Sequence, residues 1–416
     1  MNKSEQPEER YRGFDKRMEG MSLCTQCIHA GEGQKAISSF AGTTPLYQAV
    51  SYYYENNQDM SDLLDGKRSG YSYARWGNPT NVALESALST MIGGGFTLTT
   101  ASGMAANFLA IQAAGAHQGK TLLVSQEIYG NTYDIIKNSI EKFGVRCLYA
   151  DFKKLDELQH LMQKESPDVV FFEVLTNPML SVIDAPQVIE MAHSVGAKVV
   201  IDNTFASPYL YRPFMDGADY EVHSLTKYIN GHGDAMGGSV TCHEEDFSQL
   251  EYLGCTQGAI LSASNAQLIL RGLKTFVLRV RQQGENAKQL AAFLNGHPRV
   301  CNTRFPGLAN HPAHETASRL FRPGFFGGMV CFDLKDASRE MCFKMIDAMK
   351  LALPAGSLGD VFTLALHPAS TTHHSLTAEQ KQAVGIKENT IRVSVGIEEI
   401  EDLIADFSQA FDQVNE

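Results

Sequence analysis

The stretch Tyr220–Ser239, YEVHSLTKYINGHGDAMGGS, places two hydroxyl side chains beside an amine. Ser224, Thr226 and Lys227 lie within four positions, directly after a short run that is typical of the end of a strand, and a glycine-rich segment follows them. Hydroxyl groups can hold a phosphate, and a lysine that is buried near apolar or cationic neighbours loses its proton readily and can form an imine. A solvated loop without such a role is the alternative for this segment taken alone.

The composition indicates a globular protein that is long enough for two domains. The 416 residues are enough for two sizeable cores, and the 44% hydrophobic and 20% charged residues are ordinary proportions. The net charge of −12 argues against nucleic acid or an anionic membrane as the main partner, because both attract basic surfaces. No apolar run approaches the length of a membrane span. The polar segment 1–21 lacks the apolar core of a secretion signal, so we expect a disordered or loosely docked arm of a cytoplasmic protein.

The eight cysteines are scattered along the chain, and only Cys24 and Cys27 form a CxxC motif. No second CxxC and no histidine pair lies at zinc-ligand spacing, so we predict no metal site. A redox CxxC normally opens a helix after a strand, whereas this one precedes every predicted core strand. Free thiols in a reducing cytoplasm are therefore the favoured interpretation.

Strands and helices alternate on the N-terminal side of the opening stretch. Asn78-Pro79 predicts the start of the first core helix, because Asn caps helices and Pro suits their first position. The runs 169–174 and 197–201 are apolar throughout most of their length, as strands covered on both faces are. This order predicts an α/β fold with a mostly parallel sheet and helices on both faces. We expect strands at 96–100, 121–125, 146–149, 169–174 and 197–201, and helices at 78–91, 102–116, 132–143, 155–163 and 189–195.

The C-terminal part predicts a second, smaller α+β domain. Residues 261–281 read as one long helix between the two domains. Beyond it we expect strands at 328–334 and 390–395 and helices at 340–351 and 398–411. The predicted division is an N-terminal arm and extended segment (1–75), a large α/β domain (76–271) and a C-terminal α+β domain (272–416).

Several polar residues follow the predicted strands, and ligands of such sheets bind at the carboxyl ends of the strands. Asp202 could face a pyridine nitrogen and keep it protonated, and Ser102 opens a helix whose first N–H groups suit an anion. Tyr129 could stack on a planar ring. The alternatives are a helix cap or turn for Asp202, a turn for Ser102 and simple packing for Tyr129. The residues at this edge are Ser102, Tyr129, Asn177, Asp202 and 224–227.

Two further groups of residues could bind anions. Arg392 lies among apolar residues in TIRVSVG, where it is costly unless paired. It could clamp a substrate carboxylate, with Ser357 of GSLGD assisting, or it could form a buried salt bridge. Tyr73 and Arg75 precede the first core helix and could reach an anion on a neighbouring subunit, or form only a surface aromatic–cation pair.

From about Thr25 to Phe411 the chain resembles the Cys/Met-metabolism family of pyridoxal-phosphate enzymes. That family includes cystathionine γ-synthase, cystathionine γ-lyase, methionine γ-lyase and O-acetylhomoserine sulfhydrylase, and the resemblance implies a fold-type I PLP-dependent transferase-like architecture. The motifs that carry it occur in family order: YARWGNPT (73–80), ASGMAA (101–106), YGNTY (129–133), NP (177–178), VVIDNTFASPYL (199–210), HSLTKYINGHGD (223–234), LRGLKT (270–275), SLGD (357–360), HPASTTH (367–373) and IRVSVGIE (391–398).

The resemblance implies a role for each matching residue. Lys227 would bind pyridoxal phosphate as an imine and later move protons, Asp202 would pair with the pyridine nitrogen, and Tyr129 would stack on the ring and act as an acid near the leaving group. The family builds its site across a dimer and commonly pairs dimers into tetramers, so a homo-oligomer is implied. The other implied contacts are Ser102, Gly103, Met104, Ser224 and Thr226 with the phosphate, Tyr73 and Arg75 with the same phosphate from the partner subunit, Asn177 with the phenolic oxygen, and Arg392, Ser357, Asn177 and Tyr73 with the substrate.

The implied reaction is γ-elimination or γ-replacement on an L-homoserine-derived or sulfur amino acid. A β-elimination from cysteine or cystathionine and a non-catalytic cofactor-binding protein stay open as alternatives. The subfamily markers conflict, because methionine γ-lyases carry a cysteine where this chain has Asn131 and cystathionine γ-lyases carry a glutamate where it has Gly356. Many relatives have Glu or Lys in place of Phe362. We therefore expect Asn131, Gly356 and Phe362 to bear on substrate specificity.

Overall fold

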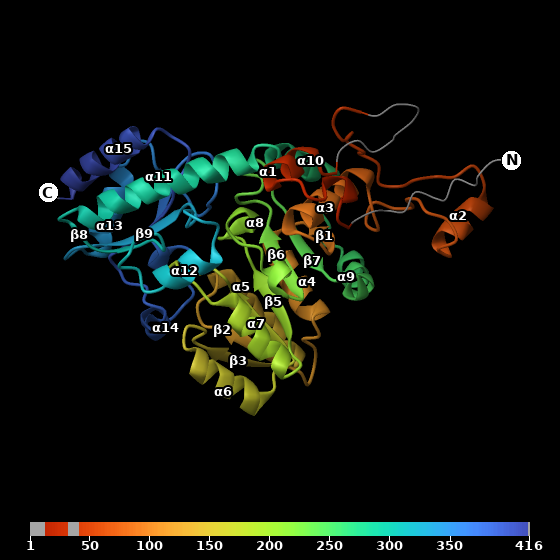
Figure 1. Ribbon diagram of the computed structural model, residues 1–416, viewed down its shortest axis with the longest axis horizontal. Coiled ribbons are helices and arrows are strands. Elements are labelled where there is room, and N and C mark those ends of the chain that lie inside the picture. Colours follow the sequence, from red (N-terminus) through yellow and green to blue (C-terminus); the bar gives the residue numbers. More distant parts are fainter. Residues whose placement is uncertain (1–12, 32–40, 415–416) are drawn as a thin grey trace.

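The computed structural model describes residues 13–31 and 41–414 of the chain (Figure 1). Two sheets organise it, a seven-stranded sheet within residues 96–242 and a five-stranded sheet within residues 300–394. Helix α11 (Phe276–Gly296) runs from the first sheet's domain to the second (Figure 1). The predicted α/β architecture with a second, smaller sheet domain is confirmed, while the predicted domain boundaries stay predictions.

The seven-stranded sheet is mostly parallel, as predicted. Its order is β1-β7-β6-β5-β4-β2-β3, and β7 alone runs in the opposite direction to the other six strands. The prediction misses β7 because this strand begins within the glycine-rich segment. Glycine is required at Gly238, since a Cβ there would lie 2.3 Å from the carbonyl oxygen of Ser102. The strands are β1 (Phe96–Thr100), β2 (Thr121–Ser125), β3 (Arg146–Ala150), β4 (Val169–Glu173), β5 (Lys198–Asp202), β6 (Tyr220–Ser224) and β7 (Gly238–Cys242).

Helices cover both faces of this sheet, as its apolar strands predict. One core joins the strands to α4, α5 and α9, and another joins their opposite face to α3, α6, α7 and α10. Asn78 caps α3 through its side chain and Pro79 is the first helical residue, which confirms that prediction. The helix expected over 132–143 is composite, because α5 continues as a π-helical turn and then a 3-10 turn. The helices are α3 (Pro79–Ile92), α4 (Gly103–Ala113), α5 (Gly130–Ile135), α6 (Leu155–Glu165), α7 (Ala185–Ser194), α8 (Ser207–Leu210), α9 (Glu244–Gln257) and α10 (Ala263–Leu273).

The single helix predicted over 261–281 is wrong, because α10 and α11 are separate helices. At the break, Arg279 donates a hydrogen bond from Nη2 to the carbonyl oxygen of Gly272 at 2.9 Å. The same guanidinium donates to the carbonyl oxygens of Tyr228 at 2.8 Å and Ile229 at 3.1 Å. One buried arginine therefore ties the last turn of α10 to the segment that follows Lys227.

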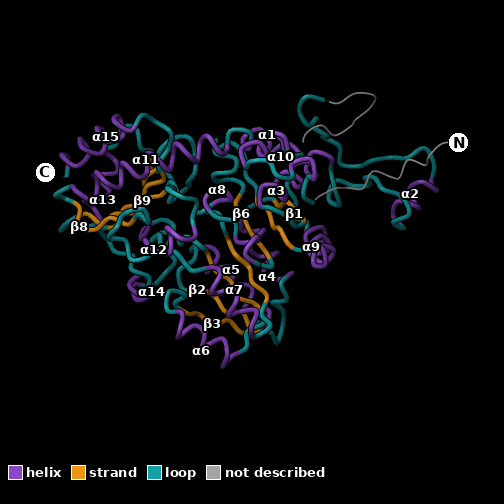
Figure 2. The backbone as a smooth tube through the Cα atoms, in the orientation of Figure 1, coloured by secondary structure: helices purple, strands orange, loops and turns teal. Residues whose placement is uncertain are grey.

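The N-terminal part divides into a docked helix and a projecting arm. Helix α1 (Leu23–His29) packs against α3 and α11. Of the arm expected over 1–21, residues 1–12 lie outside the described residues, and the part that is described is docked on α3, since the N–H of Asp15 donates to Thr90 Oγ1 at 2.8 Å. Cys24 and Cys27 are free thiols, as predicted, and burial raises the pKa of Cys27 to about 12, which opposes redox chemistry. Residues 41–75, mostly loop around α2 (Asn57–Leu64), extend away from the body of the molecule (Figures 1 and 2).

The smaller domain is built on a five-stranded sheet of order β10-β11-β12-β9-β8, in which β10 and β11 are parallel and the other pairs antiparallel. Its core packs α11, α13 and α15 on the sheet. Among the described residues no helix is both long and apolar enough to cross a membrane. The elements are β8 (Val300–Arg304), α12 (His314–Leu320), β9 (Met329–Leu334), α13 (Arg339–Ala348), β10 (Leu353–Pro354), β11 (Leu364–Leu366), α14 (Ala378–Ala383), β12 (Thr390–Ser394) and α15 (Ile400–Gln413).

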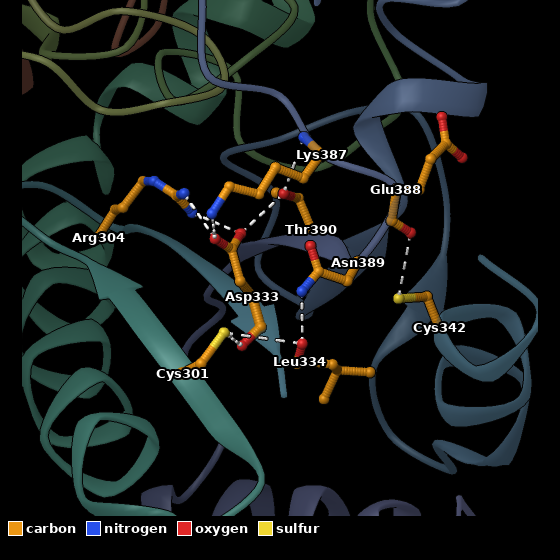
Figure 3. Close-up of polar contacts among 9 residues, drawn as sticks. All are labelled: Cys301, Arg304, Asp333, Leu334, Cys342, Lys387, Glu388, Asn389 and Thr390. Carbon is orange, nitrogen blue, oxygen red and sulfur yellow. Dashed lines mark hydrogen bonds and ion pairs between the residues drawn. The ribbon is translucent and has the colours of Figure 1, made fainter. Parts of the chain in front are cut away.

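Three neighbouring strands of this sheet meet at a buried carboxylate, Asp333 (Figure 3). Arg304 donates to both of its oxygens at 2.7 Å, and Thr390 donates to Oδ1 at 2.7 Å. Lys387 reaches Oδ2 at 3.3 Å from a side chain that is 58% exposed. Burial alone would raise the pKa of Asp333, but the hydrogen bonds and charge of Arg304 hold it below its usual range.

Replacing Asp333 with Asn is expected to lower the free energy of unfolding by about 3 kcal/mol at pH 7, because Arg304 is left buried without its counter-charge. A group whose pKa is depressed by folding stabilises the fold above its unfolded pKa and loses that contribution as the pH falls. The difference between wild type and variant should therefore be constant near neutral pH and shrink below about pH 4. Urea unfolding at several pH values measures it. Lys387→Ala is the control and should cost at most about 1 kcal/mol, since the Lys387 side chain is exposed and Arg304 still neutralises Asp333.

Candidate active site

The carboxyl edge of the seven-stranded sheet and the adjoining small domain enclose a pocket. All the polar positions predicted at strand ends contribute to it, and Arg392 and Gly356 reach it from the small domain. The lining residues are Ser102, Gly103, Met104, Asn107, Tyr129, Glu173, Asn177, Asp202, Thr204, Phe205, Ser224, Thr226, Lys227, Met236, Gly356, Leu358, Thr372 and Arg392.

One end of the pocket is the N-terminus of α4. Ser102 caps this helix, since its Oγ accepts a hydrogen bond from the backbone N–H of Ala105 at 3.1 Å. The N–H groups of Gly103 and Met104 belong to the first helical turn, where backbone donors have no intrahelical acceptor and the helix dipole adds partial positive charge. Ser224 stands against this turn, and together these groups form an anion cradle.

A second loop completes the cradle from the side of Lys227. The backbone N–H of Ser224 donates to Thr204 Oγ1 at 2.8 Å, which fixes the end of β6. Thr226 Oγ1 accepts from the N–H of Gly237 at 3.0 Å and lies 3.2 Å from the Gly237 carbonyl oxygen. Its hydroxyl is therefore oriented by the backbone and must turn away from that carbonyl in order to donate to an anion.

Gly103→Ala is expected to weaken the cradle. A Cβ at this position would lie 2.7 Å from the Cβ of Ser224, so either the helix turn or Ser224 must move. Overpacking of this kind costs about 1–3 kcal/mol, which is roughly 5- to 150-fold in an equilibrium constant. Titration of the apoprotein with pyridoxal phosphate measures the loss of affinity. Gly296→Ala is the matched control, because nothing lies within 4 Å of a Cβ there, and an equal loss in both variants would contradict the cradle.

At another point of the pocket Asp202 is held by both of its oxygens. Oδ2 accepts a hydrogen bond from Asn107 Nδ2 at 2.8 Å, and Oδ1 accepts from the backbone N–H of Thr204 at 3.0 Å. A carboxylate held in this way keeps lone pairs for one more donor, such as a protonated ring nitrogen. The turn alternative for Asp202 is thus partly right, since the residue serves the turn and faces the pocket at once.

Lys227 is half-buried in the pocket and joins the two domains. Its Nζ donates a hydrogen bond to Ser357 Oγ at 3.0 Å. Burial lowers the pKa of Lys227, and the positive charge of Arg392 lowers it further, while Asp360 opposes the change. The side chain therefore has the property required of an imine-forming amine, which is a larger neutral fraction at physiological pH.

Arg392 is 2% exposed and reaches the pocket from β12. Its Nη1 donates to Asn177 Oδ1 at 2.9 Å and its Nη2 to the Ser357 carbonyl oxygen at 3.0 Å, while Nε has no partner among the described residues. Burial lowers its pKa to about 10. These acceptors are neutral, so the salt-bridge alternative fails within the described chain, and the guanidinium is available to an anionic ligand.

Tyr129 precedes α5 at the pocket wall. Its backbone N–H donates to Glu173 Oε1 at 2.6 Å, and the N–H of Asn177 donates to Glu173 Oε2 at 3.1 Å, so this buried carboxyl organises two pocket loops. Asn131 Nδ2 donates to the phenolic oxygen of Tyr129 at 3.1 Å. Burial raises the pKa of Tyr129, so the phenol keeps its proton at neutral pH.

Five predicted site residues lie outside the pocket lining of their own chain, and one of them, Ser357, contacts the site through its hydrogen bond with Lys227. Tyr73 is 44% exposed, and the Arg75 guanidinium lies 5.8 Å from its ring, as the surface-pair alternative describes. Arg75 also donates to the Cys255 carbonyl oxygen at 2.7 Å. Asn131 contacts the site through Tyr129, and Phe362 is 37% exposed near Gly233.

Sequence reasoning misses residues that lie inside regular elements. Asn107 lies one helical turn beyond Gly103 on α4, so its spacing in the apolar helix is the signal that could have found it. Glu173 ends the apolar strand β4, where an acidic residue is unusual enough to notice. Thr204, Phe205, Met236, Leu358 and Thr372 carry no comparable signal.

The model of the Cys/Met metabolism PLP-dependent enzyme family matches residues 24–412. The chain belongs to this family. An L-methionine γ-lyase of Fusobacterium nucleatum subsp. polymorphum is 36% identical to this chain, and the alignment covers 94% of this chain and 98% of that relative. An O-succinylhomoserine sulfhydrylase of Mycobacterium tuberculosis is 34% identical, and the alignment covers 94% of this chain and 96% of that relative. The crystal structure of a cystathionine γ-synthase from Xanthomonas oryzae pv. oryzae, in complex with aminoacrylate and cysteine, is 35% identical over 95% and 98%, with a TM-score of 0.87.

The residues of this member of the family fit pyridoxal phosphate. The α4 cradle offers N–H and hydroxyl donors at a place where Gly103 leaves room for no side chain. Asp202 keeps lone pairs that suit a protonated ring nitrogen, and Lys227 offers an amine with a lowered pKa in the same pocket. The chain is thus a PLP-dependent enzyme by family and by the chemistry of its pocket.

Proposed function

We propose that this enzyme catalyses γ-elimination or γ-replacement on an L-homoserine-derived or sulfur amino acid in the cytoplasm. The observation that carries the proposal is Arg392, a buried guanidinium beside the amine of Lys227, because it selects a substrate with a carboxylate next to the reacting carbon. The named activities of the relatives, which are γ-lyases, γ-synthases and sulfhydrylases, support the same class of reaction.

Three side chains of the pocket have a role in this reaction. When bound, pyridoxal phosphate stabilises negative charge that develops at the α-carbon of the substrate. Arg392 holds the substrate carboxylate and so fixes the α-carbon near Lys227. The neutral amine of Lys227 takes protons from the substrate and returns them, because burial favours its unprotonated form. Tyr129 keeps its phenolic proton and can deliver it to a departing γ-substituent.

The proposal includes a homo-oligomer, a tetramer built from dimers, in which a second copy completes the site. The projecting residues 41–75 expose apolar side chains, including Tyr53 at 97% and Val50 at 59%, as segments that dock on a partner do. Tyr73 and Arg75 lie at the base of this arm and outside their own pocket, which suits a contribution to a neighbouring site. Light scattering after gel filtration tests the state, and a stable monomer with full activity would contradict it.

The reaction class is tested by product analysis with purified holoenzyme. L-methionine, L-homocysteine, L-cystathionine and O-acetyl-L-homoserine are supplied with and without sulfide or a thiol. Release of 2-oxobutanoate identifies elimination, and a new thioether or thiol amino acid that needs the added nucleophile identifies replacement. Pyruvate as the main product, or no product from any substrate, would overturn the proposal. Gly356 leaves open space where a glutamate stands in cystathionine γ-lyases, so we expect L-cystathionine to be the poorest cleavage substrate among the thioethers.

A further inference from the structure

We propose that Asn131 is a positioning residue that equips Tyr129 to protonate thiolate leaving groups. The inference rests on the proposed function and extends it to the selection of the leaving group. Its basis is one contact, the hydrogen bond that Asn131 Nδ2 donates to the Tyr129 phenolic oxygen at 3.1 Å. Because Asn131 donates to the phenolic oxygen, it does not accept the phenolic proton, and this proton is free to point to the substrate.

The local backbone fixes this geometry. Tyr129 is held at its N–H by Glu173, and Asn131 is the second residue of α5, so the two side chains rise from the same tight turn into the helix. Gly130 between them packs so closely that a Cβ would lie 2.4 Å from the Thr372 carbonyl oxygen. The turn is therefore clamped between β4 and the 371–374 loop, and the Asn131–Tyr129 contact does not depend on a mobile segment.

The electrostatic surroundings make this donor useful. Burial raises the pKa of Tyr129 and Glu173 raises it further, while the charge of Arg392 opposes them. A phenol in this position gives up its proton only if the phenolate is stabilised. Apart from Arg392, the Asn131 amide supplies that stabilisation by direct contact with the oxygen that becomes charged.

The proton matters in proportion to the basicity of the leaving group. As the Cγ–S bond breaks, its electron pair passes to sulfur, and sulfur takes the phenolic proton of Tyr129. Lys227 takes the β-proton, and the electron pair of the former Cβ–H bond forms the Cβ–Cγ double bond. Tyr129 then regains a proton from the attacking thiol in a replacement, or the proton held by Lys227 through water in an elimination. An ester leaves as a carboxylate, whose acid has a pKa near 4 against about 8.5 for a thiol, so it needs little protonation.

Two variants test the role. Asn131→Ala removes the donor, and Asn131→Asp keeps the shape but offers only acceptor oxygens, while an acid in the first turn of a helix favours folding. We expect kcat/KM to fall about tenfold in both variants for L-methionine and other thioethers, and to change less than about twofold for O-acetyl-L-homoserine. If the enzyme accepts only thioethers, S-aryl homocysteines, whose thiols are less basic, replace the ester as the substrate with the good leaving group. If it accepts only esters, a tenfold fall in kcat/KM for the ester in these variants contradicts the role. Equal losses for good and poor leaving groups would show a merely structural residue and overturn the proposal.

A second readout needs no substrate and so separates this proposal from the proposed function. The tyrosinate absorbance of the apoenzyme is titrated with alkali, and the Tyr129→Phe curve is subtracted to isolate Tyr129. The pKa of Tyr129 should be higher in Asn131→Ala than in the wild type, because the phenolate has lost its donor, and higher again in Asn131→Asp. An unchanged or lower pKa in Asn131→Ala would mean that the amide does not donate to the phenol, and the proposal would be wrong.

Discussion

Lys227→Ala is expected to abolish the visible absorbance of the lysine-bound cofactor and to reduce turnover by about 10³-fold or more. The reason is that Lys227 is the one lysine in the pocket lining of the described chain, and its amine has a lowered pKa, so no neighbouring lysine can replace it. Absorbance spectra of the variant after incubation with pyridoxal phosphate, together with 2-oxo acid formation, measure both losses. The phosphate cradle is untouched, so we expect the variant still to bind the cofactor.

Two controls separate loss of the amine from loss of the fold. Lys227→Arg keeps the positive charge and the contact with Ser357 but cannot form the imine, so it should behave like the alanine variant in its spectrum. Added small primary amines should restore part of the proton-transfer activity of Lys227→Ala and none of it in a misfolded protein. A variant that retains the absorbance and the turnover would exclude Lys227 as the cofactor-binding residue.

The residues at the strand ends could be predicted from the sequence because a parallel sheet imposes their convergence. Ser102, Tyr129 and Asp202 each follow a strand whose apolar pattern is clear, and the carboxyl ends of parallel strands meet at one edge. Their partners could not be predicted in this way. Asn107 and Glu173 act from within a helix and a strand, where the apolar neighbours set the pattern and a single polar residue does not change it.

The errors in the predicted fold concern elements that are shaped by contacts between segments distant in the sequence. Local periodicity carries no sign of the break between α10 and α11, because the contacts made there by Arg279 are with Tyr228 and Ile229, about fifty positions earlier in the chain. Strand β7 could not be predicted for a similar reason: the close approach of Ser102 requires glycine at position 238, and this glycine gives the strand a composition typical of a turn. Tyr73 and Arg75 stay predictions, because their expected target belongs to a second copy.

Arg392→Ala is expected to lower kcat/KM roughly 30- to 5,000-fold, which corresponds to a loss of about 2–5 kcal/mol of binding energy. The substrate carboxylate would then enter a pocket with no buried cation against it, and Asn177 would lose its donor. We expect most of the effect in KM, because the carboxylate contact is made in the ground state as well as in the transition state. The affinity for the cofactor should stay near that of the wild type, since the hydrogen bonds of Arg392 within the described residues go to Asn177 and Ser357 and not to the α4 cradle.

A paired substrate comparison shows whether the loss comes from the carboxylate. L-methionine and its amide are compared on the wild type, on Arg392→Ala and on Arg392→Lys. The amide should be a poor substrate for the wild type, but its kcat/KM should fall little further in the alanine variant, because the amide lacks the charge with which Arg392 would interact. The lysine variant keeps a charge without the two-pronged geometry, so its loss on L-methionine should be intermediate. Equal losses on acid and amide in Arg392→Ala would mean that the arginine supports the loops of Asn177 and Ser357 and does not bind the substrate.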